Sequence, residues 1–218
     1  MSMLGNYFKV ALRNILRHKV HSAINILGLA VGMACCLVVA LPVYYHLSFD
    51  RFHRNFNRLC RITIIANLKD QKPIGHGGSF GPMGRDFMND YPEVAGYARM
   101  YMDHATTQLR YKTTKIEVWS TCYSEPAFFD LFSFEFEAGD PKTALSAPNN
   151  LVLTRETARS LFGDKDPLGQ IVELNEGMSG KIKEFMVSGV LKDLPDNSHI
   201  RFDILLPIAS RWTQESLS

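Results

Sequence analysis

An uncharged apolar run at residues 23–47 limits the possible folds of this chain more than any other segment. At about 1.5 Å per residue, a helix of this length crosses the roughly 30 Å hydrocarbon core of a bilayer. A helix satisfies its own backbone hydrogen bonds, which lipid cannot do. The run exceeds the roughly 7–15 apolar residues of a signal peptide and is followed by no small-x-small cleavage site. It therefore predicts an uncleaved transmembrane helix over residues 23–47.

Charge is segregated at the N-terminal side of this run. Residues 1–22 contain Lys9, Arg13, Arg17 and Lys19 and no acid. Because Lys and Arg beside a span are retained in the cytoplasm, the predicted orientation has the N-terminus inside and residues 48–218 outside. Apolar and basic residues fall on opposite sides of a helical wheel, so residues 1–22 are expected to form a basic amphipathic helix. This helix could lie on anionic lipid or contact a cytoplasmic partner.

Small residues within the apolar run offer a surface for helix packing. Gly28 and Gly32 form a GxxxG pair, which lets a second helix approach closely. Small residues are also common in membrane helices without any such role. Near the outer end, Pro42 is expected to bend or end the helix, because it lacks an N–H group and its ring clashes with the preceding turn.

The remainder of the chain has the pattern of an α+β domain. Strands are expected at residues 58–65, 97–102, 106–111, 115–123, 170–174 and 181–191. The segments at 97–102, 106–111 and 115–123 are spaced as in a meander, and a turn at 177–180 separates the last two strands. Short helices are expected at residues 80–90, 126–132 and 154–162. Thr154 is predicted as an N-cap and Gly163 as a helix stop.

Composition excludes some functions and leaves one question open. A formal net charge of +2, with mixed charges beyond residue 22, is unlike a nucleic-acid-binding protein. The four cysteines lack metal-ligand spacing. In an oxidising compartment Cys60 and Cys122 could form a disulfide; the alternative is two buried thiols.

No motif for catalysis or cofactor binding is found. The only P-loop candidate, at Gly180 and Lys181, has Asn175 in place of the first glycine and Ile182 in place of the hydroxyl residue. His76, His104 and His199 are dispersed, without a metal-binding companion motif. Acids near turns, such as Asp50, Asp130, Asp140 and Asp193, are expected to cap backbone N–H groups. The sequence thus predicts no catalytic, cofactor-binding or metal-binding residue and no enzyme activity.

Segments on both sides of the apolar run resemble ABC-transporter permeases of the MacB/FtsX type. These are YFKVALRNILRHK at 7–19, INILGLAVG at 24–32, LSFDRFH at 47–53, PAFFDLF at 126–132, GDP at 139–141, LVLT at 151–154, LFGD at 161–164, DPLG at 166–169, VSGV at 187–190 and DLPDNSH at 193–199. They occur in the family's order and extend over nearly the whole chain. The resemblance implies a MacB-like periplasmic core domain at residues 48–218.

The resemblance also implies a function and a set of partners. Such permeases work as dimers in the bacterial inner membrane, with a cytoplasmic ATPase that uses ATP and Mg²⁺, so no cofactor is expected in this chain. They transmit ATP-driven movement to the periplasmic domain and export drugs, peptides or lipoproteins, some with a periplasmic or outer-membrane partner. Family members carry three further membrane helices, so the chain is expected to be a fragment of a longer permease or a truncated product. The alternative is a stand-alone, membrane-anchored binding or sensor module without transport activity.

Overall fold

The computed structural model describes residues 3–66, 74–176 and 182–211. The expected turn at 177–180 lies outside these ranges. The chain divides into two compact units, Met1–Phe49 and Asp50–Ser218, and each is described by itself.

The first unit consists of two helices, α1 (Met3–Arg17) and α2 (Lys19–Leu47). They are divided at His18, whose φ of −113° and ψ of 54° interrupt the helical backbone. The division falls before residue 22, where the sequence placed it, because Lys19 and the residues after it already belong to α2. Pro42 lies inside α2 and does not end it. Within the described residues, α2 is the single helix that is long and apolar enough to cross a membrane.

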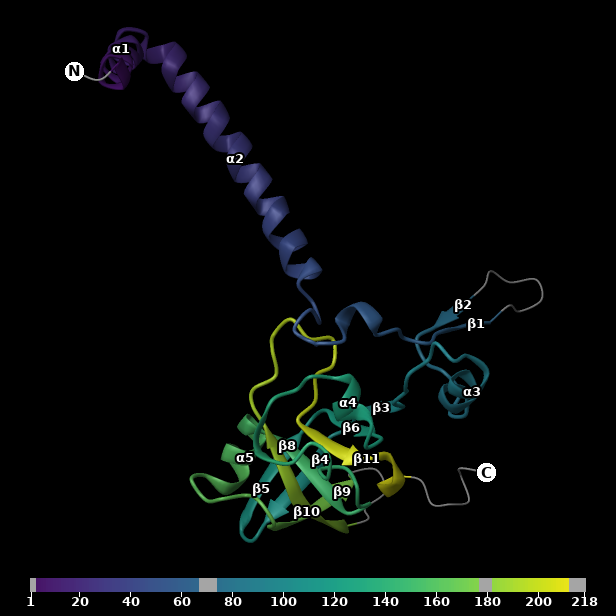
Figure 1. The fold of residues 1–218 in the computed structure, drawn as a ribbon. Coiled ribbons are helices and arrows are strands. Elements are labelled where there is room, and N and C mark those ends of the chain that lie inside the picture. Colours follow the sequence, from purple (N-terminus) through teal and green to yellow (C-terminus); the bar gives the residue numbers. More distant parts are fainter. Residues whose placement is uncertain (1–2, 67–73, 177–181, 212–218) are drawn as a thin grey trace. The chain divides into compact units, whose positions relative to one another are not determined.

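The second unit is built on a nine-stranded mixed sheet (Figure 1). Its strands are β3 (Met100–Asp103), β4 (Thr107–Tyr111), β5 (Thr114–Val118), β6 (Thr121–Ser124), β7 (Phe136–Gly139), β8 (Asn150–Thr154), β9 (Ile171–Glu176), β10 (Ile182–Leu191) and β11 (Ile204–Pro207). The order is β3-β6-β11-β8-β10-β9-β4-β5, and β7 pairs with β10 outside this path. A separate small sheet contains β1 (Ile64–Ala66) and β2 (Ile74–His76).

The meander expected for residues 97–123 is confirmed for β4 with β5 and wrong for β3, which pairs with β6. Hairpin pairing of consecutive strands occurs for β4 with β5 and for β9 with β10. By contrast, β10 runs parallel to β8 and β11 runs parallel to β6, so distant segments supply the central neighbours. Parallel neighbours require long connections, and strand spacing in the sequence does not specify their partners.

Several strand boundaries also differ from the prediction. The segment 115–123 is two strands rather than one, because the chain turns at Trp119 and Ser120, whose N–H groups donate to the Asp203 carboxylate at 2.8 and 3.0 Å. Most of the strand expected at 58–65 is absent, since the 3₁₀ turn η1 (Phe56–Arg58) precedes an irregular segment that leads into β1. The sequence did not predict β7, β8 or β11.

The described residues of this unit contain three short α-helices, and a 3₁₀ turn η2 (Ile208–Ser210) follows β11. The helices are α3 (Met83–Asp90), α4 (Phe128–Leu131) and α5 (Arg155–Phe162). The predicted N-cap of α5 is confirmed, as the Thr154 hydroxyl accepts a hydrogen bond from the Thr157 N–H at 3.3 Å. The predicted stop is confirmed as well: Gly163 adopts a φ of 63° and its N–H donates to the Arg159 carbonyl.

Two apolar clusters cover opposite faces of the central strands. Along β8, Leu151 and Leu153 enter the cluster that includes α5, whereas Val152 enters an aromatic-rich cluster around Phe128. All five residues of β8 are buried. A strand buried on both faces has no alternation of apolar and polar residues, which explains why periodicity did not reveal it.

Candidate functional site

The basic residues and glycines singled out from the sequence lie on the two N-terminal helices. Lys9, Arg13 and Arg17 belong to α1 and Lys19 begins α2; all four are exposed. Their predicted contact with lipid or an ATPase stays a prediction.

The glycine pair has open space beside it on α2. A Cβ placed at Gly28 or Gly32 would meet no atom within 4 Å. The surface is thus free for another helix, and packing there also stays a prediction.

A different set of residues gathers around Asp50, the first residue of the second unit. Its backbone has a φ of 56°, and its N–H donates to the Asn197 carbonyl at 2.9 Å. Its carboxylate accepts the His199 N–H at 3.0 Å, contacts His199 Nδ1 at 2.6 Å and accepts the Ser198 hydroxyl at 3.4 Å. We call this set, Asp50 with residues 197–199, the junction clasp.

The junction clasp favours an ionised carboxylate. Burial alone would raise the pKa of Asp50, but the hydrogen bonds from the backbone and ring of His199, together with the charge of His199, hold that pKa below its usual value. Asp50 is therefore a carboxylate at neutral pH and a strong acceptor for the 197–199 backbone.

His53 fixes the same segment to another part of the fold. It is only 3% exposed and packs against the rings of Phe52, Phe132 and Phe134. Its Nδ1 accepts the Ser133 N–H at 3.1 Å, which requires an unprotonated Nδ1. Burial lowers the pKa of His53, and the nearby Asp50 charge only partly offsets this effect. His53 is thus a neutral ring buried in the aromatic-rich cluster.

The neighbouring residues extend this attachment. The Arg54 N–H donates to the Ser133 hydroxyl at 2.9 Å. The Asn55 side chain donates to the carbonyls of Asp130 and Leu131, each at 3.2 Å. Residues 50–55 are consequently tied both to the segment after α4 and to the loop between β10 and β11.

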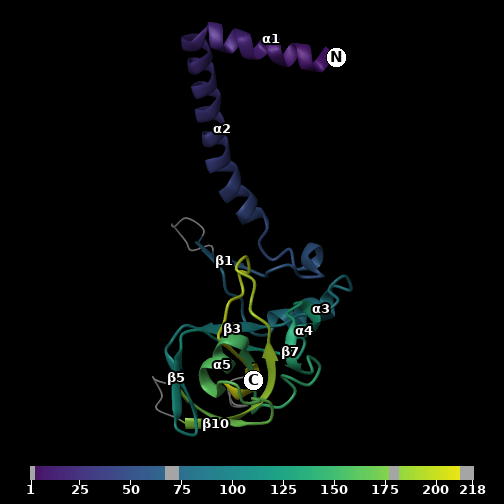
Figure 2. The ribbon, with the colours of Figure 1, turned by 90° about the vertical axis from the view of Figure 1, so that its left-hand side faces the viewer.

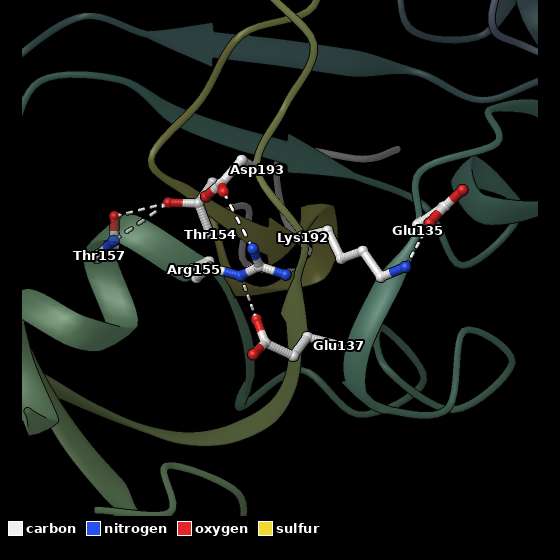
Figure 3. A network of polar contacts seen from close by, with 7 residues as sticks. All are labelled: Glu135, Glu137, Thr154, Arg155, Thr157, Lys192 and Asp193. Carbon is white, nitrogen blue, oxygen red and sulfur yellow. Dashed lines mark hydrogen bonds and ion pairs between the residues drawn. The ribbon is translucent and has the colours of Figure 1, made fainter. Parts of the chain in front are cut away.

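Ion pairs join the loop between β10 and β11 to neighbouring elements where it leaves β10 (Figure 3). Arg155, at the start of α5, contacts Glu137 at 2.5 Å and Asp193 at 3.2 Å. Beside it, Lys192 Nζ contacts Glu135 at 2.6 Å, and the Lys192 N–H donates to the Glu135 carbonyl. The base of the loop is thereby joined to α5 and to the segment that contains β7.

The other end of the loop is held by the turn that precedes β6. The Ser120 hydroxyl donates to the Arg201 carbonyl at 3.0 Å, and the Asp203 N–H donates to the Ser120 carbonyl at 2.8 Å. Arg201 also pairs with Asp196 across the loop at 3.0 Å. In Figures 1 and 2 this loop, in yellow, extends away from the sheet, with both of its ends in the sheet. The loop that contains residues 197–199 is therefore bonded to neighbouring elements at both of its ends.

Sequence reasoning treated Asp50, His199 and Asp193 as separate turn residues and did not bring them together. Asp50 and His199 are 149 positions apart. The available signal was that both lie in segments matching the permease family, at 47–53 and 193–199. The expected capping role is met where Asp50 accepts the His199 N–H and Asp140 accepts the Lys142 N–H.

The cysteines of the second unit are free thiols. Cys122 is buried, and burial raises its pKa to about 12. Cys60 is exposed, so the expectation of two buried thiols is wrong for this residue. Among the described residues, no group of three His, Cys, Asp or Glu side chains could hold a metal ion.

An apolar N-terminal helix followed by an α+β domain defines the class: a membrane-anchored domain. The MacB-like periplasmic core domain family model matches residues 22–217, so the chain belongs to this family. These are periplasmic domains of ABC-transporter permeases, and the predicted resemblance and fold are confirmed.

Three solved structures are similar to this chain. A domain described as part of a permease protein from Porphyromonas gingivalis is 28% identical with a TM-score of 0.56, over 67% of this chain and 59% of that one. The extracellular domain of the noncanonic ABC-type transporter YknZ from Gram-positive bacteria is 18% identical, with a TM-score of 0.41 over 57% and 62%. The periplasmic region of MacB from Actinobacillus actinomycetemcomitans is 14% identical, with a TM-score of 0.42 over 61% and 62%.

The match spans about three fifths of the length of the Porphyromonas gingivalis domain. No curated protein matches this sequence.

Proposed function

We propose that this chain is a permease subunit of an ABC transporter that couples ATP hydrolysis by a partner ATPase to movement of its periplasmic domain. The movement would drive export of drugs, peptides or lipoproteins from the envelope side of the inner membrane. In this proposal α1 is cytoplasmic, α2 spans the membrane, and the domain from Asp50 onward is periplasmic. The subunit acts as a dimer, and ATP and Mg²⁺ are bound by the ATPase.

The junction clasp is the observation that carries this proposal. Asp50 follows the last residue of α2, Leu47, by three positions, and it is fixed at once by hydrogen bonds to residues 197–199. A flexible linker would absorb a displacement of the helix end, because a Gly- and Ser-rich chain behaves as a random coil. A short connection fixed by charge-assisted hydrogen bonds transmits that displacement.

The path from the clasp into the sheet is continuous. Movement of Asp50 would act on residues 197–199 of the β10–β11 loop. Near its start, the same loop is attached to α5 through the ion pair between Asp193 and Arg155. His53 passes the same movement to the segment at Ser133. Chains of packed and hydrogen-bonded groups of this kind carry coupling between sites when they have two discrete arrangements.

The cytoplasmic end of the proposal rests on α1. It has an exposed basic side, no acid in its first turn, and an immediate connection to α2 through His18. A basic helix at the base of a membrane helix suits contact with an acidic surface of an ATPase, and the charges also favour anionic lipid.

Charge reversal on α1 tests the coupling role. The full chain, co-expressed with a cytoplasmic ABC ATPase and extracted in mild detergent, is expected to co-purify with that ATPase. Arg13→Glu combined with Arg17→Glu should reduce the co-purified ATPase at least about tenfold, because two attractive contacts become repulsive. The double variant must still fractionate with membranes for the result to count as loss of a partner.

The matched control reverses two charges in the second unit, at Lys115 and Lys142, both exposed. Lys115→Glu with Lys142→Glu should leave co-purification unchanged. Unchanged ATPase recovery in the α1 variant would contradict the proposed coupling and favour a stand-alone anchored module.

A further inference from the structure

A pocket of about 310 Å³ lies where the β4–β5 turn meets the C-terminal end of α5. Its volume is at the lower end of the range for small-molecule sites. The lining residues are Tyr111, Lys112, Thr113, Thr114, Arg159, Ser160, Leu161, Phe162, Gly163 and Lys165. None of them belongs to the junction clasp or its braces.

Three cations from two elements line this pocket, and no carboxylate does. Lys112 comes from the β4–β5 turn, whereas Arg159 and Lys165 come from α5 and the segment after it. In the described part of the chain none of the three forms an ion pair. Other cations of the second unit do have carboxylate partners, namely Arg99, Arg110, Arg155, Lys192, Arg201 and Arg211. Single unpaired cations also occur elsewhere in the described part of this domain, for example Lys115 and Lys142, so the feature of this pocket is that three of them line it together without an acid.

Three hydroxyl groups add to the same set of donors. Thr113, Thr114 and Ser160 line the pocket, and across residues 74–176 and 182–211 their side chains make no hydrogen bond. Guanidinium, ammonium and hydroxyl groups together are the donors that hold phosphate in proteins. The pocket thus offers six side-chain donors and no acidic acceptor.

The floor of the pocket is rigid and apolar. Tyr111, Leu161 and Phe162 are 8%, 2% and 5% exposed, and the rings of Tyr111 and Phe162 are 4.4 Å apart. The Tyr111 hydroxyl donates to the Gln170 side chain at 3.0 Å, so this ring is fixed at both ends. The pocket thus has a fixed apolar surface beneath its exposed donors.

The simpler explanation of the charges is that cations stabilise the carbonyl end of a helix. That explanation covers Arg159 and Lys165 but not Lys112, which belongs to the β4–β5 hairpin and whose Nζ lies over the Tyr111 ring, 5.1 Å from its centroid. Two acids lie close in sequence, Asp164 and Asp166, and Asp166 accepts the Leu168 N–H at 3.0 Å. Neither lines the pocket.

We propose that this pocket binds a phosphate group carried by a small soluble molecule or by a lipid headgroup. Arg159 and Lys165 would hold the phosphate oxygens from the helix side, and Lys112 would close the site from the hairpin. The apolar floor would contact the part of the ligand next to the phosphate. This site is independent of the coupling role proposed above.

Calorimetric titration of the full chain tests the site directly. In non-ionic detergent at constant ionic strength, inorganic phosphate is the soluble probe; in nanodiscs, phosphatidic acid is compared with phosphatidylcholine for the lipid source. Arg159→Gln combined with Lys112→Gln should weaken binding by about a hundredfold, roughly tenfold for each lost charged contact. Lys115→Gln combined with Lys142→Gln removes the same net charge elsewhere and should leave the affinity unchanged.

Each outcome decides the proposal. Binding of inorganic phosphate without binding of phosphatidic acid, lost in the pocket variant, identifies a soluble ligand. Binding of phosphatidic acid with the same loss identifies a lipid headgroup, whether or not inorganic phosphate also binds. No binding of either probe, or equal binding by the pocket and control variants, overturns the site. A circular-dichroism spectrum unchanged by the substitutions, which fall on exposed side chains, confirms that both variants are folded.

Discussion

Asp50 combines an unusual backbone with an unusual number of polar contacts. Its positive φ is uncommon for a non-glycine residue, although Asp and Asn adopt it more readily than others. The conformation aims both its N–H and its carboxylate at residues 197–199. The contacts with residues 197–199 hold Asp50 in this uncommon backbone conformation.

Substitutions at Asp50 should separate these two contributions. Asp50→Asn keeps tolerance of the positive φ and one acceptor oxygen, and should lower the free energy of unfolding by about 1 kcal/mol. Asp50→Ala loses both and should cost about 2–3 kcal/mol. Urea unfolding of the full chain, followed by tryptophan fluorescence, measures both. Asp90→Ala, at the exposed end of α3, is the control; an equal loss there would remove the special role of Asp50.

His53 predicts how stability depends on pH. Its pKa is lowered in the folded state, so the unfolded chain binds a proton first as the pH falls. Stability should therefore decrease from about pH 6.5 downward, where an unfolded histidine becomes protonated. The contribution of Asp50, whose pKa is also lowered, is present above about pH 4 and is lost only below it.

The pH dependence can be assigned to His53 by comparing unfolding midpoints at pH 7 and pH 5. The unfolding midpoint of the wild type should fall between pH 7 and pH 5. His53→Asn can still accept the Ser133 N–H; its midpoint should be lower at both pH values but should change less between them. His104→Asn changes an exposed histidine and should keep the wild-type slope. A His53→Asn variant with the full wild-type slope would contradict the assignment.

At the scale of elements, local signals were read correctly and long-range ones were missed. The N-cap at Thr154 and the stop at Gly163 depend on residues within one turn of α5, so sequence pattern suffices for them. The places of β7, β8 and β11 depend on burial against segments far along the chain. The sequence of β8 is a short apolar run in which apolar and polar residues do not alternate. Such a run does not distinguish a strand from other buried segments.

For the candidate site, too, local features were predicted from the sequence and long-range contacts were not. The span, the basic helix and the glycine pair were predicted from local composition. The junction clasp required knowing that the β10–β11 loop returns to residue 50, which depends on the parallel pairing of β11 with β6 and of β10 with β8. No local pattern at Asp50 or His199 specifies that pairing.

The contact between β7 and β10 depends on a glycine in the GDP segment. Gly139 has a φ of 93°, and a Cβ there would lie 2.5 Å from the Ser188 carbonyl oxygen and 2.8 Å from the Gly189 Cα. Gly139→Ala should therefore lower the free energy of unfolding by about 3 kcal/mol, from strain and from separation of the two strands.

Gly163 offers a matched control for this substitution. It also has a positive φ, but a Cβ there would meet no atom within 4 Å. Gly163→Ala should thus cost only the backbone strain, within about 1–3 kcal/mol and less than the loss at Gly139. Thermal unfolding of both variants compares them; equal losses would show that the close approach of β7 to β10 is unimportant.

In the whole molecule, coupling to the envelope requires that the second unit lies on the outer side of the membrane. The family and the single apolar helix give a membrane-anchored periplasmic domain, and the orientation is inferred from the four basic residues before the span. All coupling through the junction clasp presupposes this arrangement. If the domain faced the cytoplasm, the clasp could not transmit ATP-driven movement to the envelope.

The cysteines of the chain provide a reporter for this arrangement. Cys60 is an exposed thiol of the second unit, Cys122 is buried with a raised pKa, and Cys35 and Cys36 lie in α2. Only Cys60 should therefore react with a membrane-impermeant maleimide. Cys60→Ser is the control that should abolish labelling.

Labelling of Cys60 in intact spheroplasts is the most direct measurement. The account predicts that the full chain, expressed in the inner membrane, is labelled from outside without lysis and that Cys60→Ser is not. Labelling that appears only after the membrane is permeabilised, or a chain recovered in the soluble fraction, would contradict the anchored, outward-facing arrangement.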